Sequence, residues 1–231
     1  MDNHPIEIAN VLASIAHDLR SPLNAVIGFS KLMLKGIDGP LSDMQSADVD
    51  AIHTNGNTML QMVDGLIDLA KIEAGWYQPG KDKVPLHPML ERVTLLAMPI
   101  AEAKQVELSY KMSDVSVTFA ADPAHIQKSV ERLVLASIDL VESGTIEVTI
   151  EADAEGNSMR IEGSNPGGLY AARHSLDAFQ GGGAADAARM DAPALQLLVA
   201  GQMLGLYGCT ITAEATSETQ FRVLVRCPGS A

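Results

Sequence analysis

The chain has 231 residues, of which 47% are hydrophobic and 4% aromatic, and its formal net charge is −13. This length gives room for one large or two small domains. The acidic balance argues against a nucleic-acid partner and against contact with an anionic membrane surface, because both need a basic face. No apolar run reaches the roughly 18 residues that a membrane-spanning helix needs.

The N-terminus and the cysteines indicate a cytoplasmic protein. Residues 1–5 lack the basic and apolar regions of a signal peptide. Cys209 and Cys227 have neither metal-ligand spacing nor a redox motif, so we predict free thiols rather than a disulfide. No sensory domain precedes the first predicted helix, which indicates a stand-alone module or a fragment of a longer protein.

A first helix is predicted over residues 5–34. His17 lies nine residues after Ile8, which places it about 180° around the helix from the apolar stripe, on the solvent side. Ser21 follows one turn later on the same exposed face. Pro22 removes a helix hydrogen bond, so a bend is expected beside His17. The stripe, which we expect to be buried, consists of Ile8, Leu12, Ile15, Leu19, Leu23, Val26 and Met33.

A second helix is predicted from a capping box at residues 42–45 to Gly75. A lone hairpin cannot bury two such stripes well, so we expect a dimer that forms a four-helix bundle. The alternative is that both stripes pack on the second half of the same chain. The second stripe consists of Val49, Ile52, Met59, Val63, Leu66, Ile67 and Ala70.

A polar linker over residues 76–83 separates two predicted domains, residues 1–76 and 84–231. The second half mixes helices and strands. Asp122 and Pro123 are predicted as the N-cap and first residue of its middle helix. Helices are predicted over 86–103, 123–141 and 193–207. Strands are predicted over 106–110, 115–119, 145–152, 158–163, 210–215 and 220–226.

The segment around His17 resembles the phosphoacceptor box of sensor histidine kinases. Residues 17–24 read His-Asp-Leu-Arg-Ser-Pro-Leu-Asn, and residues 66–75 are similar to the end of the second helix of that family's phosphotransfer domain. The element order of the second half resembles the ATP-binding fold of histidine kinases and gyrase-type ATPases. The resemblance implies an α+β protein: an antiparallel helical hairpin that forms a dimeric four-helix bundle, followed by a two-layer α/β sandwich.

The resemblance also implies roles for the residues of the box. His17 would accept a phosphoryl group, and Asp18 would orient its ring or take its proton. Ser21 occupies the place of a small polar residue that positions water for dephosphorylation. The partner implied is the receiver domain of a response regulator. The predicted regulator contacts are Arg20, Pro22 and Asn24.

The three family boxes that hold ATP and Mg²⁺ are degenerate in this chain. At the two positions where the family has asparagines, this chain has an arginine, whose charge would repel the metal, and an alanine, which has no ligand atom. A serine replaces the adenine-binding aspartate, and the phosphate-cradling glycines are gone. We therefore expect no ATP binding and no metal bound by this chain. The degenerate positions are Arg132, Ala136, Ser164, Ala194 and Gln196.

An intact phosphoacceptor box beside a broken ATP site predicts a histidine phosphotransferase, or pseudo-histidine kinase. It would relay phosphoryl groups between response-regulator aspartates through phosphohistidine at His17, with Mg²⁺ supplied by the regulator. Two alternatives stay open. One is a non-catalytic dimeric adaptor or phosphatase-like regulator, and the other is a divergent ATP-dependent kinase. The sequence names neither the regulators nor the direction of phosphoryl flow.

Overall fold

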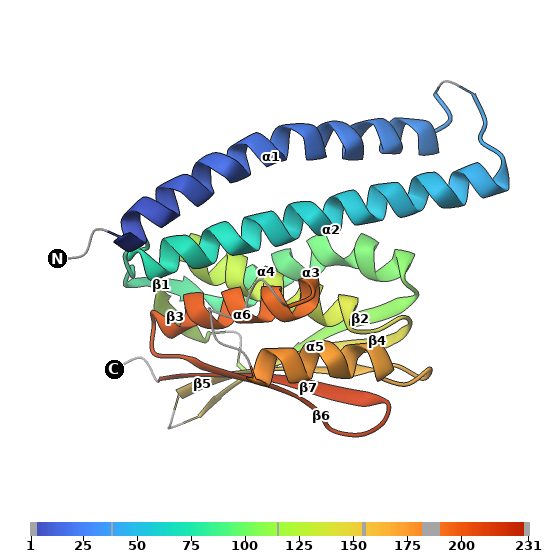
Figure 1. Cartoon of the computed structure of the whole chain (residues 1–231). Helices are drawn as coiled ribbons and strands as arrows, with labels where there is room; N and C mark the ends of the chain where they lie inside the picture. Colours follow the sequence, from blue (N-terminus) through green and yellow to red (C-terminus); the bar gives the residue numbers. More distant parts are fainter. Residues whose placement is uncertain (1–3, 38, 115, 154–155, 182–189, 229–231) are drawn as a thin grey trace. The chain divides into compact units, whose positions relative to one another are not determined.

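The computed structural model describes residues 4–37, 39–114, 116–153, 156–181 and 190–228. The chain divides into two compact units, residues 1–76 and 77–231 (Figure 1). The first unit is a helical hairpin. The second unit is an α/β domain built on a mixed sheet.

The hairpin consists of α1 (His4–Leu34) and α2 (Asp43–Glu73). The predicted capping box opens α2: the Ser42 hydroxyl accepts a hydrogen bond from the Gln45 backbone N–H at 3.3 Å, and the Gln45 side chain accepts one from the Ser42 N–H at 3.0 Å. Pro22 lies inside α1, which continues past it and curves along its length (Figure 1). Both predicted helices are therefore confirmed, close to their predicted ends.

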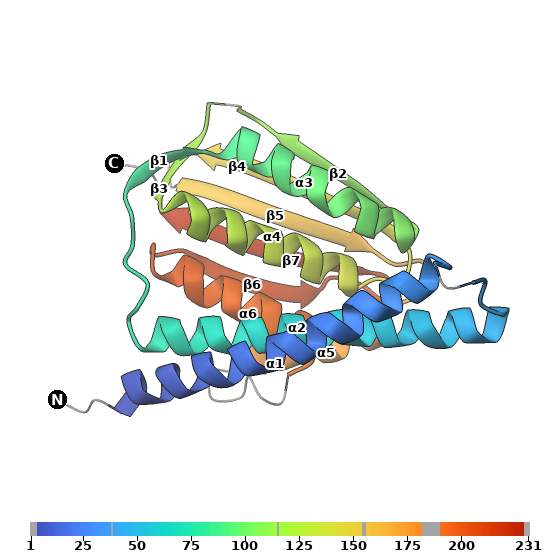
Figure 2. The same cartoon turned by 90° about the horizontal axis from the view of Figure 1, so that it is seen from above.

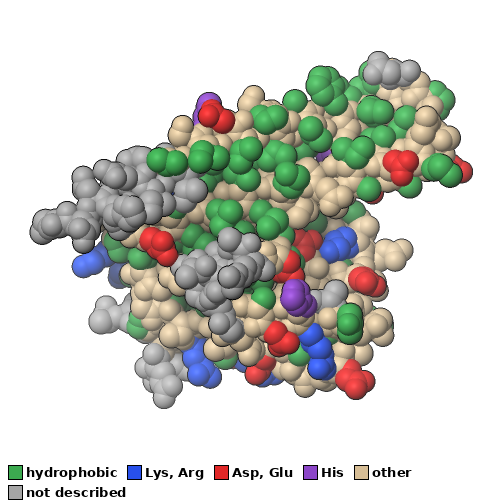
Figure 3. Space-filling view, viewed as in Figure 1, with side chains coloured by type: hydrophobic (Ala, Val, Ile, Leu, Met, Phe, Trp, Pro, Cys, Tyr) green, Lys and Arg blue, Asp and Glu red, His purple; other side chains and the backbone are tan. Residues whose placement is uncertain are grey.

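The predicted apolar stripe of α1 is divided between two faces in a single chain. The buried side of α1 carries Ala16, Leu23 and Ser30 at seven-residue spacing, so Leu23 is the stripe member that is buried in the single chain. The other stripe members whose side chains the structure describes are exposed in the single chain, so burial of the whole stripe, which was expected in a dimer, stays a prediction. In Figure 3 apolar side chains gather along the hairpin. The exposed large apolar side chains of α1 and α2 include Ile15, Leu19, Val26, Phe29, Met33, Ile52 and Met59.

The sheet of the second unit has the strand order β2-β4-β5-β7-β6. Strand β2 runs parallel to β4, and the other neighbours are antiparallel. A separate two-stranded sheet joins β1 to β3. The strands are β1 (Asp82–Pro85), β2 (Val106–Met112), β3 (Thr118–Ala121), β4 (Gly144–Asp153), β5 (Gly156–Ser164), β6 (Thr210–Ala215) and β7 (Gln220–Pro228).

Helices α3, α4 and α6 cover one face of the five-stranded sheet (Figure 2), and α5 packs beside α6 and β6. The core between helices and sheet is mainly aliphatic, with Phe119 and Phe221 among its few aromatic side chains, in keeping with the low aromatic content. Asp122 caps α4 as predicted: its carboxylate accepts from the N–H groups of Ala124 and His125 at 2.8 and 3.1 Å. The helices are α3 (Leu86–Ala103), α4 (Pro123–Asp139), α5 (Tyr170–Gly181) and α6 (Ala192–Gly205). The predicted α+β class is confirmed.

Two elements were not predicted, and one strand is displaced. Strand β1 lies partly in the predicted linker, and helix α5 falls in a stretch for which we predicted no element. The strand predicted over 115–119 is found over Thr118–Ala121, and residue 115 lies outside the described residues. A four-residue strand has no periodicity to detect, and its pairing with β3 depends on residues more than 30 positions away.

The cysteines contradict their prediction as free thiols. Cys209 and Cys227 are joined by a disulfide, with their Cα atoms 4.1 Å apart. The cause is strand register: Thr210 pairs with Arg226, so the residues just outside that pair face each other where β6 and β7 meet. Spacing along the chain does not reveal this neighbourhood. Because these cysteines form a disulfide, they no longer support a cytoplasmic location. The cytoplasmic location stays a prediction.

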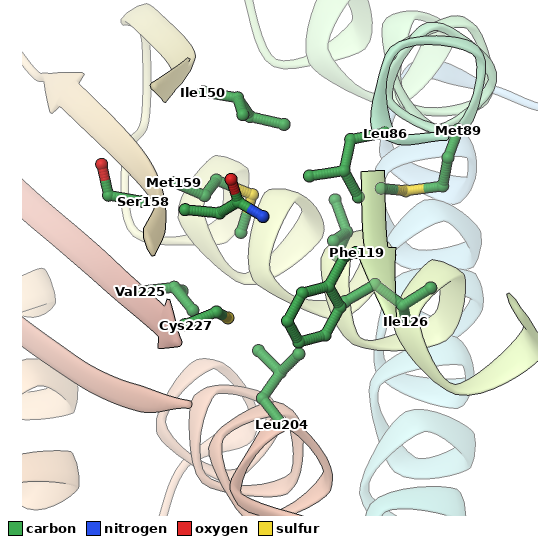
Figure 4. Close-up of a pocket in the computed structure, with 12 residues that line it drawn as sticks. Leu86, Met89, Phe119, Ile126, Ile150, Ser158, Met159, Leu204, Val225 and Cys227 are labelled. Atoms are coloured by element: carbon green, nitrogen blue, oxygen red, sulfur yellow. The ribbon is translucent and has the colours of Figure 1, made fainter. Parts of the chain in front are cut away.

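A small cavity of about 30 Å³ lies in the core of the second unit (Figure 4). Val130 of α4 lines it and is buried. The side chains around it also include Leu86, Met89, Phe119, Ile126, Ile150, Met159, Leu204 and Val225.

Filling this cavity is expected to stabilise the protein. Val130→Ile adds one methylene, which matches the void, and should raise the free energy of unfolding by about 0.5–1 kcal/mol in urea denaturation. Val134→Ile is the matched control, because Val134 is fully buried on the same helix but does not line the cavity. It should overpack and cost about 1 kcal/mol or more. Equal effects of the two changes would contradict the assignment of a fillable void.

The linker after α2 is held on the second unit by a polar cluster. The Tyr77 ring meets the His125 ring edge-on, with centroids 4.9 Å apart. The Tyr207 hydroxyl lies 2.7 Å from Nδ1 of His125 and accepts hydrogen bonds from the backbone N–H groups of Asp122, at 3.2 Å, and Gly80. With its lone pairs used in this way, the hydroxyl donates its proton to His125. Burial raises the pKa of Tyr207, so the hydroxyl stays protonated at neutral pH.

Candidate functional site

His17 is presented to solvent from the middle of α1. Its side chain is 83% exposed and that of Asp18 is 80% exposed. Nδ1 of His17 lies 3.6 Å from a carboxylate oxygen of Asp18. This leaves Nε2 on the far side of the ring as the accessible nitrogen. A neutral imidazole placed in this way can act as a nucleophile toward a group on another protein.

The hairpin fixes the turn that carries His17. Ala16, directly before it, is buried. One turn later, Nε and Nη2 of Arg20 donate hydrogen bonds to one carboxylate oxygen of Asp64 on α2, at 2.9 and 2.7 Å. This contact ties the two helices together beside the site. Sequence reasoning did not identify Asp64; its pairing with Arg20 depends on how α2 lies against α1.

The remaining residues of the box lie on the same short stretch of α1. Ser21, Pro22 and Asn24 are exposed, and Ser21 stands one helical turn after His17. Pro22 has no N–H to donate, so the carbonyl of Asp18 lacks its usual helix partner. Arg20, predicted as a regulator contact, instead uses part of its guanidinium to hold Asp64. The regulator-contact roles of these residues stay predictions.

In the second unit, two of the positions that we predicted to be degenerate nucleotide-binding positions contact each other. Arg132 of α4 donates a hydrogen bond from Nη1 to the side-chain carbonyl of Gln196 on α6. Gln196 is buried, as are Ala136 and Ala194, which carry no polar side-chain atom. The two helices are therefore bridged by a side-chain contact at positions where the family resemblance implies a metal ligand and a phosphate-binding backbone.

The loop after β5, where the resemblance implies that Ser164 replaces an adenine-binding aspartate, is folded on itself. The buried Asn165 amide donates to the Gly168 carbonyl at 2.7 Å, and its oxygen accepts from the Gly167 N–H at 3.2 Å. Its backbone N–H donates to the Thr219 carbonyl at 2.8 Å. Sequence reasoning missed Asn165, although an Asn-Pro-Gly-Gly string is typical of such a side-chain-closed turn.

Metal-ligating side chains do not cluster in the part of the chain that the structure describes: no group of three or more His, Cys, Asp or Glu side chains could hold an ion there. Within the same residues, no helix is both long and apolar enough to cross a membrane.

Comparison with known proteins agrees with this geometry. Residues 7–75 match the His Kinase A (phospho-acceptor) domain. The chain is 33% identical over 153 residues to the signal transduction histidine-protein kinase BarA of Escherichia coli K12, a match that covers 65% of this chain and 16% of BarA. It is 28% identical over 207 residues to the virulence sensor protein BvgS of Bordetella parapertussis, covering 87% of this chain and 17% of BvgS.

Solved structures show the same fold. Full-length ShkA in complex with AMPPNP matches with a TM-score of 0.65 and 20% identity, over 96% of this chain and 47% of ShkA. The Acinetobacter baumannii histidine kinase AdeS matches with a TM-score of 0.60 and 15% identity, over 93% of this chain and 98% of the AdeS chain.

The hairpin is thus a His Kinase A phospho-acceptor domain. Over the rest of the chain, the proteins to which it is similar include sensor histidine kinases, which agrees with the sequence resemblance. It spans only about a sixth of the length of the curated relatives BarA and BvgS.

Proposed function

We propose that the chain is a histidine phosphotransferase, a pseudo-histidine kinase that relays phosphoryl groups between the aspartates of response regulators. The observation that carries this proposal is the contrast between the two units. The hairpin presents His17 in an intact phospho-acceptor box, whereas Arg132 and Gln196 bond to each other at positions that should hold nucleotide. A protein with an acceptor and no ATP site must receive its phosphoryl group from another phosphoprotein.

The chemistry needs only this chain's histidine and a phosphorylated receiver domain. Nε2 of neutral His17 would attack the phosphorus of an aspartyl phosphate, forming a P–N bond as the P–O bond to the aspartate breaks. The aspartate leaves as a carboxylate. Asp18, 3.6 Å from Nδ1, is placed to take the ring proton and to return it when the group moves on to a second aspartate. Mg²⁺ would come with the regulator and offset the charge of the transferred group.

A homodimer is part of the proposal, because the hairpin leaves a continuous apolar face uncovered. A soluble monomer rarely exposes so many large apolar side chains along one pair of helices. A second hairpin with the same face would cover it and complete a four-helix bundle.

ATP is expected not to bind at millimolar concentration in the presence of Mg²⁺. The Arg132 guanidinium would repel the metal, and the buried Gln196 side chain stands where a phosphate-binding glycine is needed. Isothermal titration calorimetry measures this directly. Gln196→Ala, which removes the bridge, should not restore binding, because the asparagine and aspartate ligands are still missing. Micromolar affinity, or label on His17 from γ-labelled ATP, would contradict the pseudo-kinase proposal.

A phosphatase-like regulator is the second candidate, and one observation favours it. Ser21 is exposed one turn after His17, where its hydroxyl could position a water molecule toward an aspartyl phosphate. The two functions differ in where the phosphoryl group goes. Mixing the protein with a phosphorylated regulator and detecting phosphohistidine supports relay, whereas loss of regulator phosphate with no phosphohistidine supports the phosphatase.

A further inference from the structure

We propose that the helix-free face of the five-stranded sheet carries a binding site for a small ligand with several phosphate groups, and that Arg226 is its main contact. This site lies on the opposite face of the sheet from α4 and α6, which carry the degenerate nucleotide boxes. It is therefore independent of the proposed relay.

Strand register defines the centre of the open face. Arg226 of β7 pairs with Ser158 of β5 on one side and with Thr210 of β6 on the other. Two residues along, Leu224 pairs with Arg160. Side chains on one face of a sheet repeat every two residues, so all five point outward together. On this face the Arg226 guanidinium therefore lies between the hydroxyl-bearing residues Ser158 and Thr210. Arg160 is its diagonal neighbour on β5.

These side chains line a hollow of about 780 Å³. That volume is within the range typical of small-molecule sites. The charged residues of its lining are Arg160, Arg222, Arg226 and Glu151, that is, three cations and one anion. Glu162 and Glu214 lie opposite Arg222 on the neighbouring strands, so carboxylates offset Arg160 and Arg222, and the local positive charge that favours an anionic ligand is that of Arg226.

Two of the arginines are held in place by carboxylates. Nη2 of Arg160 donates to Glu151 at 2.9 Å, and Nε and Nη2 of Arg222 donate to one oxygen of Glu162 at 3.0 and 2.9 Å. Each guanidinium has five N–H donors, so both retain donors for a further acceptor. The carboxylates reduce the side-chain entropy that a ligand would otherwise have to overcome.

Arg226 is different, because it is exposed and makes no ion pair or side-chain hydrogen bond with the residues that the structure describes. An unpaired guanidinium between two hydroxyls suits a phosphate group, which can accept from both kinds of donor. Arg222 and Arg226 are four residues apart on one strand face, about 13 Å along the strand. That spacing favours a ligand with several separated charges rather than a ligand with one compact charge.

The test is titration of the intact chain with inorganic tripolyphosphate, followed by calorimetry and by amide NMR shifts at Ser158 and Thr210. We expect saturable binding that Arg226→Gln weakens at least tenfold. Arg92→Gln is the matched control, because Arg92 is an exposed arginine on α3 outside the hollow, and it should leave the affinity unchanged. Thermal melts that match the parent show that both variants are folded.

Three results would overturn the proposal: no saturable binding, equal weakening by both substitutions, or amide shifts confined to other parts of the chain. Citrate is the second probe, since it carries compact carboxylate charge. Citrate binding as tight as that of tripolyphosphate, with the same dependence on Arg226, would overturn the assignment to phosphates. Relay through His17 should be unchanged in Arg226→Gln without ligand, so failure of this site and failure of the relay are distinguishable.

Discussion

Replacing His17 with alanine is expected to abolish phosphoryl relay while changing the free energy of unfolding by no more than about 0.5 kcal/mol. The side chain is 83% exposed, and among the residues that the structure describes it makes an ion-pair contact only with Asp18, so little packing is lost. No other group of the box can form the phosphoramidate bond that relay requires. The measurement is transfer of radioactive phosphate from one purified regulator to another, with urea denaturation as the stability check.

Two further variants serve as controls for this prediction. His174→Ala removes another exposed histidine, on α5, and should leave transfer at the parent rate. His17→Gln keeps a polar side chain of similar length and should still allow a regulator to bind, which separates docking from chemistry. Normal relay by His17→Ala would refute the phosphotransferase proposal. Regulator binding without any phosphohistidine, in parent and variant alike, would leave the adaptor function in its place.

Phe29→Glu is expected to convert the dimer into a monomer. Phe29 is 68% exposed in the single chain and lies on the apolar face of the hairpin. If a second copy covers that face, the substitution buries a carboxylate without a partner, which costs several kcal/mol per site and applies twice in a symmetric dimer. Light scattering coupled to size exclusion should show the mass fall from dimer to monomer at micromolar concentration.

Leu95→Glu is the matched control for this change. Leu95 is 62% exposed on α3, in the second unit, so the same charge is introduced on an apolar surface outside the hairpin. The control should remain dimeric. A monomeric parent would show that the apolar face has another occupant, and loss of the dimer in both variants would show that the interface is not confined to the hairpin.

The sequence predicted those features that depend on neighbours along the chain. The capping box of α2 and the Asp122 cap of α4 are contacts across three residues or fewer, and both are present. The exposure of His17 follows from helical periodicity alone. The role of His17 does not follow from periodicity, because an exposed histidine is common on helix surfaces. Only the sequence of residues 17–24 indicated phosphoryl transfer.

Features that depend on contacts between distant segments escaped prediction. The Cys209–Cys227 disulfide needs the register of β6 on β7. The contact between Arg132 and Gln196 needs α4 to lie beside α6. The residue types at these two positions led to the prediction that a nucleotide site is lost, but only the fold shows that the two side chains bond to each other.

The polar cluster around Tyr207 has a mechanical consequence. Helix α2 is closed at its end by Gly75, with a φ of 69°, and by a hydrogen bond from the Trp76 N–H to the Lys71 carbonyl at 2.9 Å. Tyr77, the next residue, already rests against His125. Only the peptide unit between residues 76 and 77 therefore lies between the hydrogen bond that closes α2 and the ring contact on His125, so the cluster leaves almost no free backbone at this point of the linker.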